Sequence, residues 1–214
     1  MSKIDSAFLI ASFRRASDRL EAERRVLCAL DGEIGDGDHG ISMANGFAAI
    51  NSRLRDLDGS DTKPAALLRI AADAFLGEVG ATVGPLYASA LIYGARLLDA
   101  EDIEQRQIGR LIVAFGDGIK ARGHAELGEK TMIDVWYPAG RAAIAAADDG
   151  LDVAGIAGVL REAAEQASET TITMMAARGR ASRLKERSLG HLDPGGASAA
   201  IIITAIAEAM VSAP

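Results

Sequence analysis

A short acidic segment, residues 31–40 (DGEIGDGDHG), holds the side chains most suited to chemistry in this sequence. It carries four carboxylates, on Asp31, Glu33, Asp36 and Asp38, and no lysine or arginine. Carboxylates crowded in this way repel one another unless a hard cation lies between them, and Mg²⁺ prefers such oxygen ligands. The glycines allow a turned loop in which Asp36 and Asp38 converge. The segment therefore predicts a magnesium site; the alternative is a solvated acidic turn whose aspartates cap the next helix.

Two further segments have residues suited to binding phosphate. Residues 77–85 (GEVGATVGP) are glycine-rich, so the backbone can approach a ligand, and Pro85 would open a helix whose N-terminal amides favour an anion. Four arginines and a lysine between Arg178 and Arg187 are opposed only by Glu186, and the guanidinium group suits phosphate oxygens. The alternatives are a tight helix–helix turn for the first segment and a solvated basic face for the second.

Two apparent nucleotide motifs fail on their context. The acidic segment spells G-x-G-x-x-G, but it follows a helical stretch where a dinucleotide fingerprint follows a strand, and its aspartates would repel a pyrophosphate. Residues 123–131 (GHAELGEKT) come close to a P-loop, yet Glu129 separates the last glycine from Lys130 and no strand precedes them. Neither stretch is taken as a phosphate-binding loop.

The residues that must position these segments repeat with a helical period. Apolar side chains recur at steps of three and four, alanine is abundant, and alternating β-branched runs are nearly absent. The two β-branched runs, 170–173 and 201–204, are expected to be buried helix. Pro64, Pro85 and Pro194 fall near first-turn positions, and Asp193 is placed to cap the last helix. The pattern predicts an all-α protein of about eight helices, at 5–30 (one helix, open to a kink), 41–56, 64–77, 85–99, 103–121, 131–147, 153–177 and 195–211.

Connections of two kinds alternate along this chain. Those near 57–63, 100–102 and 148–152 are short and polar, whereas those near 31–40, 78–84, 122–130 and 178–194 are rich in Gly, Asp, His and Arg. In an up-and-down antiparallel bundle, alternate connections lie at the same end. We therefore expect the four unusual connections to meet at one end and to form a single site for a metal–polyphosphate ligand.

Composition excludes several other classes of protein. The 214 residues are 49% hydrophobic and 25% charged, which suits one globular domain over residues 1–214. With 23 Lys and Arg against 30 Asp and Glu, the formal net charge is −7, so binding to nucleic acid or to an anionic membrane is not expected. A single cysteine, Cys28, excludes an internal disulfide, and the N-terminus lacks the pattern of a signal peptide. The longest apolar stretch, 197–211, is shorter than a membrane span of about 20 residues. These features predict a cytoplasmic protein.

Three long stretches resemble the nucleotide-binding subunit of dihydroxyacetone kinases, a family called DhaL. They are LDGEIGDGDHG (30–40), GEKTMIDVWYPA (128–139) and ITMMAARGRASRLKERSLGHLDPGGAS (172–198), and the resemblance covers nearly the whole chain. It implies a barrel of eight antiparallel helices with a nucleotide, ADP or ATP, bound at one rim through two Mg²⁺ ions. The positions that match the family's metal ligands are Asp31, Asp36 and Asp38. The positions that match its nucleotide contacts are His39, Gly40, Ile41, Ser42, Thr82, Val83, Gly123, Met132, Arg180, Asp193, Pro194 and Gly195.

The resemblance also implies a phosphotransferase that works with partners. A phosphoryl carrier protein (DhaM-like) would convert bound ADP to ATP, which would phosphorylate dihydroxyacetone held on a separate keto-sugar-binding subunit (DhaK-like). Arg180 is the expected catalytic residue, clamping the transferring phosphoryl group. Two alternatives stay open: an ATP-dependent kinase subunit for a related keto sugar such as a tetrulose, and a non-catalytic ADP-sensing protein. The oligomeric state, a homodimer included, and an apolar ligand inside the barrel are not fixed by the sequence.

One departure from the family pattern lies in the glycine-rich segment. Where the family commonly reads Gly-Gly-(Ser/Ala)-Ser-Gly, residues 80–84 read GATVG. Ala81 therefore replaces a glycine, and Val83 lacks a hydroxyl expected near phosphate. The loss of one hydrogen-bond donor typically costs about 1 kcal/mol, so we expect an effect on nucleotide affinity, with Thr82 as the neighbouring hydroxyl.

Overall fold

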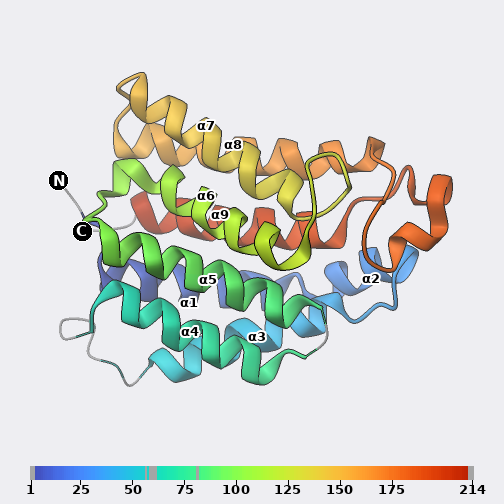
Figure 1. Cartoon of the computed structure of the whole chain (residues 1–214), viewed down its shortest axis with the longest axis horizontal. Coiled ribbons are helices and arrows are strands. Elements are labelled where there is room, and N and C mark those ends of the chain that lie inside the picture. Colours follow the sequence, from blue (N-terminus) through green and yellow to red (C-terminus); the bar gives the residue numbers. More distant parts are fainter. Residues whose placement is uncertain (1–2, 56, 58–61, 81, 212–214) are drawn as a thin grey trace.

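In the computed structural model the chain folds into helices that run along one long axis (Figure 1). The structure describes residues 3–55, 57, 62–80 and 82–211. The all-α class predicted from the sequence is confirmed. The α-helices in these ranges are α1 (Ser6–Ala22), α2 (Arg24–Ile34), α3 (His39–Leu54), α4 (Pro64–Glu78), α5 (Val83–Ala100), α6 (Ile108–Gly123), α7 (Ile133–Asp148), α8 (Val153–Thr170) and α9 (Pro194–Val211), and the 3₁₀ helices are η1 (Gln105–Gln107), η2 (Thr171–Thr173) and η3 (Ala181–Ser188).

Eight of these helices close into a ring. Neighbours pack against each other in the order α1, α3, α4, α5, α6, α7, α8 and α9, and α9 packs against α1 to complete the ring. The remaining helix, α2, lies outside it against α3 and α9. Connections between successive ring helices therefore fall alternately at the two ends of the ring, as the sequence pattern requires.

Polar and proline residues start several helices where the sequence predicts. The carboxylates of Asp5, Asp152 and Asp193 each accept a hydrogen bond from the backbone N–H three residues further on, at 2.7–2.8 Å. Pro64 and Pro194 are the first residues of α4 and α9. These caps satisfy N–H groups that have no partner within a helix, and proline loses nothing at such a position.

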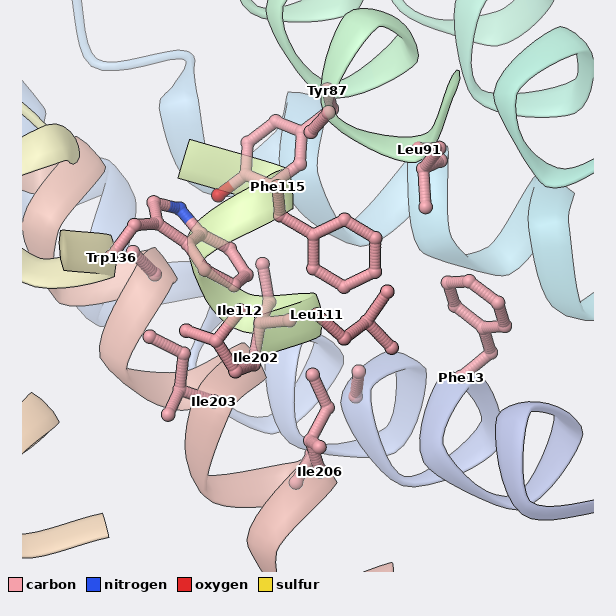
Figure 2. Packing of buried hydrophobic residues seen from close by; sticks show 14 of the residues in the cluster. Phe13, Tyr87, Leu91, Leu111, Ile112, Phe115, Trp136, Ile202, Ile203 and Ile206 are labelled. Atoms are coloured by element: carbon pink, nitrogen blue, oxygen red, sulfur yellow. The ribbon is translucent and has the colours of Figure 1, made fainter. Parts of the chain in front are cut away.

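Aromatic side chains fill the interior of the ring. The rings of Phe115 and Trp136 meet edge to face with their centroids 5.8 Å apart, and Tyr87 lies 6.4 Å from Trp136. Figure 2 shows these side chains packed with Ile202 and Ile206 of α9. The cavity that remains among them measures about 30 Å³, which is room for about two water molecules. The interior is therefore filled by the protein's own side chains and leaves no room for a lipid-sized ligand.

The helix predicted over 5–30, open to a kink, is interrupted at Glu23 and continues to Ile34. The chain turns at Glu23, so α1 and α2 are separate helices. Only Leu27 and Ile34 of α2 are buried, which is too little apolar surface for a place in the ring. The chain therefore leaves the ring early, and α2 carries Asp31 to the end of the molecule.

The prediction that helix 153–177 continues past residue 170 is wrong. After Thr170 the chain forms the short η2 helix and becomes extended at Met174. The buried ammonium of Lys130 accounts for this change, because it binds the carbonyl oxygens of Thr171 and Met174, which a continuing α-helix would use internally. Of the run 170–173 only Thr171 is buried, whereas 201–204 lies inside α9 as predicted.

The other predicted helices are confirmed with shifted ends. The helix predicted from residue 41 begins at His39, the one from 85 begins at Val83, and the one from 103 begins with η1 and continues as α6. Most of the connection predicted near 57–63 lies outside the described residues.

Helix α9 is the one helix in the described ranges that is long and apolar enough to span a membrane, with a mean hydropathy of 1.5 over 18 residues. However, 78% of that stretch is buried, and α9 packs against α1, α7 and α8. These contacts make it a core helix of the ring. Figure 1 shows the start of α1 and the end of α9 at the same end of the molecule, opposite α2 and the α2–α3 connection.

Candidate functional site

The four unusual connections meet at one end of the ring, as their alternation predicts. All four contribute to one cleft of about 570 Å³, a size usual for small-molecule sites. The cleft is lined by Asp31, Ile34, Gly35, Asp36, Asp38, His39 and Ser42; by Gly80, Thr82, Val83, Pro85 and Leu86; by Ile119, Arg122, Gly123, Ala125, Lys130, Thr131, Met132 and Ile133; and by Arg178, Gly179, Arg180, Ala181, Asp193, Pro194 and Gly195.

The three predicted metal ligands lie together on one wall of the cleft. Asp31 belongs to the last turn of α2, and Asp36 and Asp38 belong to the connection 35–38. One carboxylate oxygen from each residue lies within 4.8 Å of the others. A backbone N–H, that of Asp38, donates to Asp31 Oδ2 at 3.0 Å and folds the connection back onto α2. Three carboxylates so placed fit the oxygen ligands that Mg²⁺ prefers. The alternative of a capping aspartate is met in part, because Asp38 makes no cap hydrogen bond but Asp31 Oδ2 also accepts from the N–H of His39, the first residue of α3, at 3.3 Å.

A cationic side chain faces this acidic cluster. The guanidinium of Arg180 forms an ion pair with the carboxylate of Asp36. The side chain of Arg180 is 58% exposed, and an ion pair of such exposure adds little to stability. Arg180 can therefore exchange the carboxylate for a phosphate at small cost, and its forked donors suit phosphate oxygens.

His39 joins the start of α3 to the start of α9. It is buried, and its Nε2 lies 2.8 Å from Ser198 Oγ, while that hydroxyl donates to the carbonyl of Gly195 at 3.0 Å. Which of the two atoms donates in the contact between Nε2 and Ser198 depends on which ring nitrogen carries the proton. Burial lowers the pKa of His39, against the opposing effect of the Asp31 carboxylate, so the imidazole is neutral near pH 7. A neutral imidazole here positions the two helix starts that border the cleft.

Asp193 is a buried acid on the opposite wall. Its carboxylate caps α9 through the N–H of Gly196 at 2.7 Å, and its own N–H donates to Thr171 Oγ1 at 3.0 Å. Burial raises the pKa of Asp193 to about 7, although the bond from Gly196 and the charge of Lys130 act in the opposite direction. Its charge therefore changes near neutral pH, unlike that of an ordinary aspartate.

Sequence reasoning missed Lys130, which lies beside the cleft but is only 2% exposed. Its Nζ donates to the carbonyl oxygens of Thr171 (2.7 Å), Met174 (3.2 Å) and His191. Burial lowers the pKa of this ammonium, and the carboxylate of Asp193 acts against that shift. The sequence does mark Lys130, in the GEKT stretch, but as a failed P-loop lysine and not as a residue that binds backbone.

Two acidic residues hold the connection that carries Lys130. The carboxylate of Asp134 accepts hydrogen bonds from the N–H groups of Gly128 (2.5 Å) and Thr131 (2.8 Å), on either side of Lys130. Glu129 accepts from Arg178 Nε at 2.7 Å, and that guanidinium holds the pKa of Glu129 below its usual range. The third connection is thus fixed to α7 and to the basic segment.

The glycine-rich connection is shorter than the sequence suggests. Helix α5 begins at Val83, two residues before Pro85, and Thr82 precedes it without a side-chain cap bond. Thr82 and Val83 both line the cleft, so the departure from the family pattern at Val83 lies on the cleft wall. The first turn of α5 borders the cleft, where helix N–H groups favour an anion. Ala81, the other departure, lies outside the described residues.

Thirteen of the fifteen predicted site residues line the cleft, and two do not. Gly40 is buried where α2 crosses α3, and a Cβ added to it would lie 2.1 Å from the carbonyl oxygen of Arg24. Ile41 is 47% exposed and is not part of the lining. The resemblance placed both at the nucleotide, whereas the structure gives Gly40 a role in helix packing.

Known proteins are similar to this chain in sequence and in fold. The DAK2 domain family matches residues 33–208. The ADP-binding subunit DhaL of PEP-dependent dihydroxyacetone kinase 1 from Listeria innocua is 35% identical over 195 residues, which cover 91% of this chain and 92% of that protein. The DhaL subunit from Escherichia coli is 35% identical over 196 residues, with the same coverage of both chains. The dihydroxyacetone kinase of C. freundii, solved in complex with AMP-PNP and Mg²⁺, matches with a TM-score of 0.72 and 24% identity, over 94% of this chain and 34% of that one.

Proposed function

This chain belongs to the DAK2 domain family, and from that premise we propose that it is the ADP-binding phosphotransferase subunit of a phosphoenolpyruvate-dependent dihydroxyacetone kinase. It would accept a phosphoryl group from a carrier protein onto bound ADP and pass it to dihydroxyacetone held by a partner subunit. The observation that carries the proposal is the cleft in which three clustered carboxylates face Arg180. Relatives that carry this name match the chain over nearly its full length.

The acidic wall is proposed to hold the metal. Asp31, Asp36 and Asp38 would bind two Mg²⁺ ions, which neutralise the negative charge of phosphate oxygens when bound. The bond from the Asp38 N–H to Asp31 Oδ2 holds the connection against α2, where the three residues already lie together.

The other walls are proposed to bind the nucleotide. Thr82, at the start of α5, and Gly195, at the start of α9, would supply N–H groups to phosphate oxygens. Arg180 would bind the transferring phosphoryl group and balance the charge that develops on it. The remaining predicted contacts that line the cleft are His39, Ser42, Val83, Gly123, Met132, Asp193 and Pro194.

Partners and context complete the proposal. The relatives are named as subunits of a PEP-dependent kinase, which supports a DhaK-like keto-sugar subunit and a DhaM-like carrier as partners. We propose that residues 1–214 act as one nucleotide-binding domain, supported by the single ring and the family match over 33–208. We also propose a cytoplasmic location, as predicted from the sequence.

The test is to identify nucleotide carried by the purified protein. The protein is denatured and the released nucleotide is separated by chromatography, beside a sample first treated with EDTA. Stoichiometric ADP that EDTA removes is the expected result, since metal and nucleotide share the cleft. Phosphoryl transfer is then measured with a dihydroxyacetone-binding subunit and the phosphorylated carrier. Binding of Mg²⁺–ADP without transfer would favour the ADP-sensing alternative, and an absence of binding would overturn the proposal.

A further inference from the structure

The segment that carries Arg180 has little to hold it in place by itself. Between Met174 and His191 only Ala176 and Ser188 are buried, so almost no apolar surface fixes this stretch. One backbone bond closes its base, from the N–H of Gly190 to the carbonyl of the η2 residue 172 at 2.9 Å, and a second joins the N–H of Ala177 to the carbonyl of Glu129 at 3.0 Å. Segments with so few buried contacts open easily unless polar contacts tie them down.

Lys130 binds both ends of this segment at once. Two of its acceptors, the carbonyls of Thr171 and Met174, lie where the chain enters, and the third, the carbonyl of His191, lies where it leaves. A lysine ammonium has three N–H donors, and all three are used by backbone oxygens. Lys130 therefore has no donor left for a ligand, although it borders the cleft.

The position of Lys130 is itself enforced. Its backbone has a positive φ of 58°, which is uncommon for a residue with a side chain. The carboxylate of Asp134 binds the N–H of Gly128 and that of Thr131, and so fixes the backbone on both sides. A conformation of this kind persists only where surrounding contacts hold it.

From this geometry we infer that Lys130 is a positioning residue: its ammonium holds the segment 174–191 over the cleft and so acts on phosphoryl transfer through Arg180. The effect on transfer rests on the proposed function, but the effect on the segment does not. This role needs three N–H donors on one nitrogen atom. Methionine has no donor, and the planar guanidinium of arginine spreads its donors over three nitrogens.

The first experiment measures how often the segment opens in the whole chain. Wild type, Lys130→Met and Lys130→Arg are digested with an arginine-specific protease, and cleavage after Arg178, Arg180, Arg183 and Arg187 is followed by mass spectrometry. We expect cleavage to be faster by about tenfold or more in Lys130→Met, and by less in Lys130→Arg, because cleavage follows the population of the open segment. Helical circular dichroism is recorded for each variant, and Lys130→Arg carries the test if Lys130→Met does not fold.

The matched control is Lys120→Met. Lys120 lies on α6 at the same end of the ring, and its ammonium binds the carboxylate of Glu126, outside the segment, at 2.6 Å. The same substitution there removes an equal charge from a partly exposed pair. Cleavage in the segment should therefore stay within about twofold of wild type.

The second experiment asks whether Lys130 acts through Arg180. Transfer rates are compared for wild type, Lys130→Met, Arg180→Ala and the double variant. We expect Lys130→Met alone to lower the transfer rate by about tenfold and Mg²⁺–ADP affinity by less, and to have almost no further effect when Arg180 is already alanine. A general loss of structure would lower the rate in both backgrounds.

The outcomes separate this inference from the proposed function. Unchanged cleavage in Lys130→Met would overturn the positioning role, whatever the enzyme does. Loss of Mg²⁺–ADP binding without faster cleavage would show direct contact with the ligand and would overturn it as well. Faster cleavage in a protein whose wild type transfers no phosphoryl group would support the hold on the segment and overturn the proposed function instead.

Discussion

Replacement of Gly40 by alanine tests whether α2 and α3 must touch for the acidic cluster to form. The added Cβ would lie 2.1 Å from the carbonyl oxygen of Arg24 and 2.9 Å from Cys28 N, whereas real Cβ contacts stay above 3.0 Å. Helix α2 must then withdraw by at least about 0.9 Å, because the close neighbour is backbone and cannot rotate away. Overpacking of this kind costs about 2 kcal/mol in the free energy of unfolding.

The same shift should disturb the metal ligands. Asp31 belongs to α2, whereas Asp36 and Asp38 lie in the connection to α3. One carboxylate oxygen from each of the three residues lies within 4.8 Å of the others in the wild type. We expect Gly40→Ala to lower the melting temperature by about 4–8 °C, which is the scale of about 2 kcal/mol for a chain of this size. Mg²⁺ titrated in the presence of ADP should bind more weakly in the same variant.

Gly32→Ala is the matched control. Gly32 lies on α2, the helix that Gly40→Ala would displace, and a Cβ added there would meet nothing within 4 Å. Alanine is the better helix former, so this variant should melt at or slightly above the temperature of wild type. If Gly40→Ala melts like wild type and loses only nucleotide affinity, Gly40 contacts the ligand directly and the packing argument is refuted.

Three further predictions concern the walls of the cleft. Asp36→Asn and Asp38→Asn should each abolish Mg²⁺-dependent ADP binding, measured by calorimetry, with unchanged helical circular dichroism; binding that persists would rule out these residues as metal ligands. Arg180→Ala should lower the transfer rate more than it lowers ADP affinity, and equal losses would mean that Arg180 only binds. Because burial raises the pKa of Asp193 from 3.8 to about 7, the folded state keeps a proton that the unfolded chain releases, so this residue makes stability fall as pH rises between these values and has no further effect above them. Asp193→Asn keeps a capping side chain and should flatten that slope in melting temperatures measured from about pH 4 to pH 8; an identical slope in both proteins would show that Asp193 ionises normally.

The location of the site could be predicted from the sequence because two independent patterns agree. Helical periodicity predicts how many helices, and so how many connections, the chain has. The composition of the connections then shows which of them hold residues suited to binding metal or phosphate. An antiparallel ring then leaves only one arrangement for the alternate connections. Local rules were also enough for the cap at Asp193 and for the start of α4 at Pro64.

The features that could not be predicted depend on contacts between distant residues. The early end of α8 follows from Lys130, which lies 41 residues from Thr171 in the chain, and helical periodicity carries no information about such a partner. From the sequence alone, Gly40 fits a ligand contact and a close helix crossing equally well. The position of α2 is needed to choose between them. Because α2 lies outside the ring, α1 is followed in the ring by α3.

The position of the chain ends has a consequence for how such a unit can be combined with others. The end of α9 lies a full helix length, roughly 27 Å, from the cleft at its start, and Lys3 bonds to Asp102 in the connection between α5 and α6, at the far end from the cleft. The points at which a further polypeptide could be joined are therefore distant from the cleft. One ring can thus serve as a separate subunit or as a module within a longer chain, such as the C. freundii kinase of which it matches about a third.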